Sequence, residues 1–119
     1  YVNIAQFYKA ESLARLGRND EARIEFENTI KRCRATALEN PAAIDAYMLR
    51  ALSLSKIGRN EEALEMIDYV VSLAPSTAEA HSARAMILHE LGQDDEVKQE
   101  QKIIAEIGGE LSTVMSYLA

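Results

Sequence analysis

The chain has 119 residues, of which 48% are hydrophobic and 27% are charged, with five glycines and two prolines. This length and composition are typical of one folded domain and exclude a disordered or fibrous protein. The formal net charge of −6 argues against a surface for nucleic acid or for an anionic membrane, because both need clustered Lys and Arg.

The apolar periodicity and the chain-breaking residues predict six helices and a partial seventh. In chain order these helices span about 2–16, 19–38, 42–57, 60–73, 76–91, 94–107 and 110–118. Pro41, Pro75 and the pair Gly108-Gly109 are expected to end the second, fourth and sixth helices. Strand patterns are absent from the sequence, so we expect an all-α fold.

Three segments of the sequence are near copies of one another: "KAESLARLGRNDEA", "RALSLSKIGRNEEA" and "RAMILHELGQDDEV". They align on Gly17, Gly58 and Gly92, which are 41 and 34 residues apart. Upstream of each Gly, apolar residues three positions apart form one stripe of a helix. Each Gly should end its helix, because a left-handed conformation has no steric cost for Gly. Each unit is therefore predicted to be a helix, a tight turn and an antiparallel helix.

The residues after each Gly fit the start of the next helix. We expect Asn19, Asn60 and Asp94 to be its N-cap residues. The two acids that follow each of them should oppose the positive end of the helix dipole.

The first spacing between glycines exceeds the second by seven residues, which is close to two helical turns. The extra residues should lengthen helix 19–38 without rotating its buried face. Ile30, Cys33 and Ala37 continue the apolar stripe through this extension, so Cys33 is expected to be a packing residue and not a reactive thiol. As the single cysteine, it can form no intrachain disulfide, which fits a reducing, cytoplasmic location.

A helix–turn–helix unit of 34 residues with this pattern resembles the tetratricopeptide repeat. In residues 44–77 the pattern of this family falls on Tyr47, Ala51, Leu54, Gly58, Ala63, Ile67, Val70 and Pro75. The first unit has Gln6 at the aromatic position, and the third has His81 there, with Val97 and Gln101 also departing from the pattern. These departures predict a less tightly packed last hairpin.

The resemblance implies a right-handed superhelix of three antiparallel hairpins over about 3–40, 44–77 and 78–109. A C-terminal capping helix over about 110–118 would complete a single domain, 1–119. Because the chain begins at Tyr1 and both ends are in helical rhythm, we expect a piece of a longer chain or one trimmed to its ordered part.

The resemblance also implies that the first helices of the pairs line a concave groove that binds peptide segments or partner helices. We expect its lining to be Phe7, Tyr8, Glu11, Arg15, Met48, Leu49, Leu52, Lys56, Met86 and His89, flanked by Ile4, Ser55, Ser82, Ala83 and Glu90. The apolar end of this lining suits an apolar or amphipathic protein segment. Alternatively, neighbouring repeats, the terminal helix or a second copy cover the stripe, and the array is a structural spacer or a self-associating element.

Family members that bind the acidic tails of heat-shock chaperones use a clamp of Lys, Asn and Arg. The corresponding positions here hold Phe7, Glu11, Leu49, Glu79 and Ala83, none of which is basic or Asn. We therefore expect no carboxylate clamp.

The sequence shows no convergent catalytic, cofactor or metal site. His81 and His89 lie about 12 Å apart along one helix, and a His–metal bond is only about 2 Å long. The basic run around Cys33 fits a solvated helix edge, and there is no Gly-rich phosphate loop. No apolar run approaches the roughly 18 residues of a membrane span, and the first residues lack the basic–apolar–small pattern of a signal peptide. We expect a non-catalytic protein-interaction module, a scaffold or adaptor, with no cofactor or metal and no membrane insertion.

Overall fold

The computed structural model describes the backbone over residues 2–118 and the side chains over residues 2–108. Within these residues the fold is all-α, as predicted. The helices are α1 (Val2–Arg15), α2 (Asn19–Glu39), α3 (Ile44–Lys56), α4 (Asn60–Leu73), α5 (Ala78–Glu90) and α6 (Asp94–Leu118). The bounds of α1 to α5 agree with the predicted ones to within two residues.

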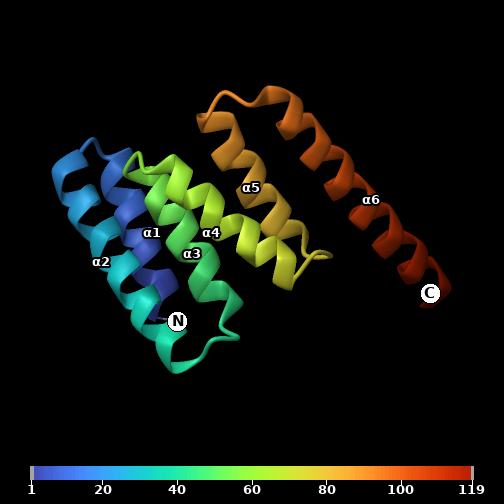
Figure 1. Cartoon of the computed structure of the whole chain (residues 1–119), viewed down its shortest axis with the longest axis horizontal. Helices are drawn as coiled ribbons and strands as arrows, with labels where there is room; N and C mark the ends of the chain where they lie inside the picture. The colour runs from blue at the N-terminus through green and yellow to red at the C-terminus, as the bar shows by residue number, and fades with distance from the viewer. Residues whose placement is uncertain (1, 119) are drawn as a thin grey trace.

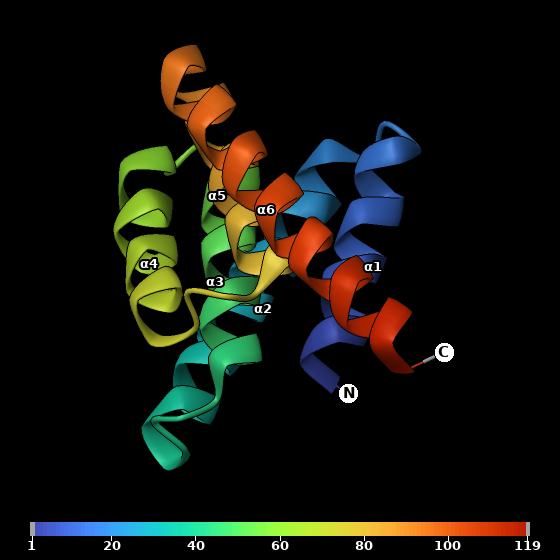
Figure 2. The same ribbon diagram turned by 90° about the vertical axis from the view of Figure 1, so that its right-hand side faces the viewer.

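The helices pack as successive antiparallel hairpins, α1 with α2, α3 with α4 and α5 with α6 (Figure 1). Each hairpin also packs on the next, through α2 against α3 and α4 against α5. In addition, α3 contacts both α1 and α5, so the first helices of the three hairpins lie side by side (Figure 2). The result is an elongated array of 48 × 33 × 26 Å.

The repeated alanines lie where the helices cross. Ala10 faces Ala22 in one buried cluster, where the rings of Phe7 and Phe26 also meet edge to face with centroids 5.8 Å apart. Ala51 and Ala63 belong to a larger buried cluster shared by α3, α4 and α5. Small side chains at these positions let the helix backbones approach closely, and the larger neighbours fill the space around them.

The three corner glycines have the predicted left-handed conformation, with φ of 79° at Gly17, 86° at Gly58 and 75° at Gly92. At the first corner the N–H of Arg18 donates to the carbonyl of Leu13 at 2.9 Å, and the N–H of Gly17 donates to Ala14 at 3.1 Å. The other two corners repeat this pair of bonds. Each corner is therefore a Schellman motif, which satisfies the last carbonyls of the preceding helix.

The predicted N-caps are wrong by one residue. Asn19 and Asn60 are the first residues of their helices, and neither helix has a side-chain cap hydrogen bond among the described atoms. Arg18 and Arg59 take the N-cap position, and the carbonyl of Arg59 accepts the N–H of Ala63 at 3.0 Å. The reason is that one left-handed Gly already redirects the chain, so the residue after it both ends one helix and begins the next. The oxygen of Asn60 instead accepts the Ser55 hydroxyl at 2.7 Å.

The second acid after Gly17 and the second acid after Gly58 each have a side-chain partner that the sequence did not reveal. Arg18 donates two hydrogen bonds to Glu21, at 3.0 and 2.5 Å, and Arg59 donates two to Glu62, at 2.8 and 2.5 Å. The hydrogen bonds from Arg59 lower the pKa of the Glu62 carboxyl. Each of these paired Arg–Glu hydrogen bonds links the Gly corner to the first turn of the second helix. The repeated sequence "GRN" therefore has the same structural role in the first two hairpins.

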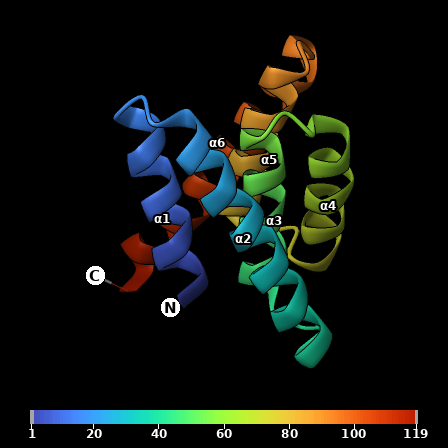
Figure 3. The ribbon, with the colours of Figure 1, turned by 90° about the vertical axis from the view of Figure 1, so that its left-hand side faces the viewer.

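The extra seven residues lengthen α2, as predicted. This helix has 21 residues, whereas its counterpart α4 has 14. Figure 3 shows α2 continuing past the start of α1 to the turn before α3. Cys33 is fully buried in this extension, which confirms its packing role.

The separate closing helix predicted over 110–118 is wrong, because α6 runs without a break from Asp94 to Leu118. A Gly-Gly pair weakens a helix by about 1 kcal/mol per residue but stops it only where the backbone turns left-handed, and Gly108 is helical. Figure 1 shows α6 extending past the start of α5. The expected apolar cover by residues 110–119 concerns side chains that lie outside the described residues. None of the helices in the described range is both long and apolar enough to cross a membrane.

Candidate partner-binding groove

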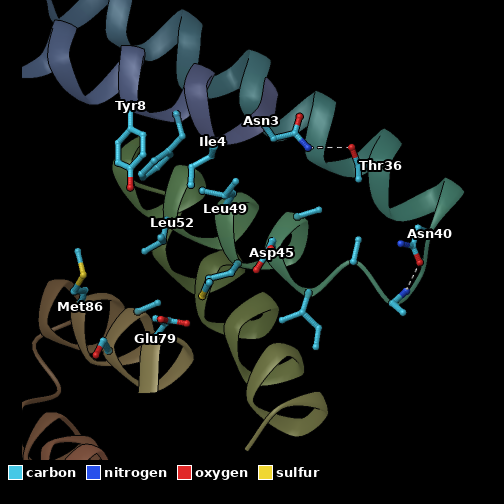
Figure 4. Close-up of a pocket in the computed structure, with 18 of the residues that line it drawn as sticks. Asn3, Ile4, Tyr8, Thr36, Asn40, Asp45, Leu49, Leu52, Glu79 and Met86 are labelled. Carbon is cyan, nitrogen blue, oxygen red and sulfur yellow. Dashed lines mark hydrogen bonds between the residues drawn. The ribbon is translucent and has the colours of Figure 1, made fainter. Parts of the chain in front are cut away.

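A cavity of about 1130 Å³ opens between the first helices of the three hairpins and the turn between α2 and α3 (Figure 4). Its large apolar side chains come from α1, α3 and α5, one helix per hairpin. These residues are Ile4, Phe7, Tyr8, Ile44, Met48, Leu49, Leu52 and Met86.

Six of the ten residues predicted to line the groove lie around this cavity. They are Phe7, Tyr8, Met48, Leu49, Leu52 and Met86. Ile4, Ser82 and Ala83, which we expected beside them, are also part of the lining.

The remaining four predicted residues lie outside the cavity. Glu11 and Arg15 pair with each other along α1, at 3.4 Å. Lys56 lines a smaller pocket on the α1–α2 side. His89 is exposed, and its Nδ1 is 3.7 Å from Oδ1 of Asp94. These side chains lie nearer the Gly corners, at the opposite end of the first helices, so the mixed-charge end of the predicted groove is not part of this cavity.

The accessible part of the lining is smaller than its residue list suggests. Phe7 is only 5% exposed and belongs to the core between α1 and α2. Tyr8, Met86 and Ile4 are 58%, 53% and 41% exposed. A partner would therefore contact these three side chains first, with half-buried Leu49 and Leu52 forming the floor.

One end of the cavity is polar, and sequence reasoning missed most of it. Asn3 donates to the Thr36 hydroxyl at 3.0 Å, and the Asn40 side-chain oxygen accepts the N–H of Ala42 at 3.2 Å (Figure 4). The long α2 brings Thr36 and Asn40 to this place. The predicted length of that helix was the one available signal for it.

Two acids lie at the same edge of the cavity, Asp45 in the first turn of α3 and Glu79 in the first turn of α5 (Figure 4). Both side chains are exposed. Among the described residues neither acid forms an ion pair, and no Lys or Arg lines the cavity. The groove thus combines an apolar floor with a negatively charged edge.

A second polar feature lies outside the groove and joins the last hairpin to the second. Buried His81 faces the Glu100 carboxylate through Nδ1 at 2.6 Å and the Pro75 carbonyl through Nε2 at 2.7 Å. Glu100 also accepts a hydrogen bond from Arg84 at 2.5 Å, and Arg84 donates to Asp68 at 2.7 Å. Burial alone would lower the pKa of Arg84, but its hydrogen bonds to Asp68 and Glu100 raise it overall.

This network explains the His at the aromatic position of the third repeat. Both nitrogens of His81 face acceptors, so the ring satisfies both partners when each nitrogen carries a proton. Among residues 94–108 Glu100 is the buried side chain of α6. The pairing could not be predicted from the sequence, because His81 and Glu100 are 19 residues apart.

Two observations concern metal ligands and the single cysteine. They contain no group of three or more His, Cys, Asp or Glu side chains placed to hold a metal ion. Burial raises the pKa of the Cys33 thiol from 9.0 to about 11, although Arg50 partly offsets the rise. A thiol with so high a pKa is a poor nucleophile at neutral pH.

Antiparallel helix pairs stacked in series, with a groove lined by the first helix of each pair, define the class of α-helical repeat proteins. The family model that matches the sequence is the tetratricopeptide repeat, over residues 48–96, from α3 into α6. Residues 48–96 thus match the tetratricopeptide repeat, and the three hairpins in series have the fold that such repeats form. No curated protein gives a significant match.

Solved structures of MamA have a similar fold. The structure titled MamA AMB-1 superposes with a TM-score of 0.59 at 16% identity, over 92% of this chain and 76% of that chain. A point mutant of MamA gives a TM-score of 0.56 at 16% identity, over 90% of this chain and 98% of that chain. At this level of identity the likeness concerns the fold alone.

Proposed function

We propose that this protein is a non-catalytic interaction module whose groove binds a helix or peptide segment of a partner protein. The observation that carries the proposal is the convergence on one cavity of apolar side chains from three different helices, exposed on α1 and α5 and half-buried on α3. Tyr8 from α1 and Met86 from α5 extend towards it, with Leu49 and Leu52 of α3 between them (Figure 4). Tetratricopeptide repeats as a class bind protein partners, which supports this use of the surface.

The lining has the chemistry of a binding surface. Exposed Tyr offers a large, rigid contact area, and Met adapts its shape to irregular partners. A cavity of about 1130 Å³ is larger than most small-molecule sites, which range from about 300 to 1000 Å³. Both properties favour a macromolecular segment over a metabolite. The absence of Lys and Arg from the described lining also argues against a carboxylate clamp.

Site-specific photocrosslinking tests this proposal. A photoreactive amino acid at Tyr8 or Met86 should capture the same partner segment, because the two positions flank one cavity. The matched control positions are Ile24 and Leu73, which are apolar and exposed but do not line the cavity. Equal capture from all four positions, or capture from the controls alone, would refute a groove-specific partner.

The second candidate is a structural spacer or an oligomerisation element within a larger protein. The exposed apolar surface of the groove would then be covered by the parent chain or by a second copy. The same crosslinking separates the two cases, because peptide mass spectrometry of the product identifies the captured sequence. Capture of this chain's own sequence would favour self-association over an adaptor function.

A further inference from the structure

Resting on the groove proposed above, we infer that its occupant is a basic amphipathic helix, which places Lys or Arg side chains against Asp45 and Glu79. The inference concerns the chemistry of the partner and has two parts, the conformation of the bound segment and its charge. Each part follows from a different feature of the lining.

The conformation follows from the supply of hydrogen-bond partners. An extended peptide would present its backbone N–H and C=O groups to the lining, and burying them without partners costs free energy. The floor is apolar, with Leu49, Leu52 and Met48 at its centre. Asn3, which donates to Thr36, and Asn40, which accepts from Ala42, lie at the polar end of the cavity and not on this floor (Figure 4). A helix satisfies its own backbone and can bury an apolar face here.

The charge follows from the edge of the cavity. Asp45 and Glu79 are exposed, lie on neighbouring first helices and form no ion pair with any described side chain. No basic residue of the described lining neutralises them. A segment that is apolar on one face and basic beside it therefore matches the groove, whereas an acidic segment would place like charges together.

Both acids also have an ordinary role, because an acid in the first turn of a helix interacts favourably with the helix dipole. A test must separate this role from recognition. Glu61 and Asp95 provide the control, since they are exposed acids in the first turns of α4 and α6 and do not line the cavity. The double variant Glu61→Gln/Asp95→Asn makes the same change in charge and in dipole interaction as Asp45→Asn/Glu79→Gln.

The experiment measures fluorescence anisotropy with two labelled helical peptides of about four turns. They share one Leu-rich face and differ only in carrying Lys or Glu beside it. The wild type should bind the Lys peptide at least about fivefold more tightly than the Glu peptide. The variant Asp45→Asn/Glu79→Gln should lose most of this preference, whereas Glu61→Gln/Asp95→Asn should keep it.

The outcomes distinguish this inference from the proposed function. If Tyr8→Ala/Met86→Ala weakens both peptides but the wild type binds them equally, the groove stands and the basic partner is refuted. A third outcome is that the Lys peptide binds but neither the groove variant nor Asp45→Asn/Glu79→Gln weakens its binding. The binding is then unspecific attraction to an acidic protein, and both the basic partner and the proposed groove are refuted. Tighter binding of the Glu peptide would also overturn the inference.

Discussion

At the residue scale, single positions of the repeat do separate physical tasks. Gly58 adopts a φ of 86°, which side-chain-bearing residues rarely adopt, and a Cβ there would meet no atom within 4 Å. The constraint on this position is therefore the backbone conformation and not steric contact. Cys33, in contrast, is fixed by burial in the extension of α2, and Thr29 by burial one turn before it.

The corner glycine gives the first prediction. Gly58→Ala should lower the free energy of unfolding by about 1 to 2 kcal/mol, because Ala pays the cost of a left-handed backbone. Gly108→Ala should instead raise it by about 0.5 to 1 kcal/mol, because Gly108 lies in a helix with open space at its Cβ position. Urea denaturation of both variants checks the pair. A loss of stability in Gly108→Ala would contradict the continuous α6.

The buried thiol gives the second prediction. Its pKa is raised from 9.0 to about 11 by burial, so folding favours the protonated form. The corresponding stability is fully present below pH 9.0 and is lost as the pH rises to about 11, a loss of about 2 to 3 kcal/mol at most. Denaturation at several pH values should show a shallower decline for Cys33→Ala than for the wild type. Equal declines, or rapid labelling of the native thiol at pH 7, would contradict the burial of Cys33.

At the element scale, the last hairpin has a buried polar contact at the position where the second has a pair of aromatic rings. In the second hairpin the ring of Tyr47 meets that of Tyr69 with centroids 5.2 Å apart. In the third hairpin the equivalent of Tyr47 is His81, which binds Glu100 and the carbonyl of Pro75. The network ties α6 to α5 and to the turn after α4, so its loss should loosen α6 more than any other helix.

Replacing the buried histidine tests the role of the network. His81→Phe restores the aromatic residue of the family but leaves Glu100 without one of its partners, and we expect a loss of about 2 to 4 kcal/mol. His81→Phe/Glu100→Leu should recover most of that loss, because the apolar pair leaves no buried charge. Hydrogen exchange should show the faster opening concentrated in α6.

The exposed histidine supplies the matched control for this experiment. His89→Phe changes the same residue type on the same helix, where the side chain lies in solvent, and should alter stability by less than about 0.5 kcal/mol. Equal effects of His81→Phe and His89→Phe would mean that the network does not stabilise the hairpin.

At the scale of the whole molecule, the sequence predicted what depends on neighbours along the chain. The Gly corners, the five helices before α6 and the longer α2 follow from apolar spacing and from glycine conformation, which are local properties. The prediction was wrong where a local signal was ambiguous. A glycine pair can end a helix or be carried through it, and Asn60 can cap a helix or begin one.

The groove was predicted in part, for the same reason. The stripe containing Tyr8, Leu49 and Met86 follows from helical periodicity, whereas its boundaries depend on how three hairpins stack. That stacking leaves Glu11 and Lys56 outside the cavity and brings Asn3 beside Thr36, which is 33 residues away. The network of His81 and Glu100 could not be predicted, since the two residues lie on different helices and no periodic pattern in the sequence relates them.

The most direct test of the groove as a binding surface is the affinity for the crosslinked partner segment, measured with two matched double variants. Tyr8→Ala/Met86→Ala removes the two exposed apolar side chains that flank the groove and should weaken binding by at least about 10-fold. Ile24→Ala/Leu73→Ala makes the same kind of change on exposed positions outside the cavity and should stay within about twofold of the wild type. Circular dichroism should show both variants folded, because all four side chains are exposed. Equal affinities for the two variants would contradict the assignment of this groove as the binding surface.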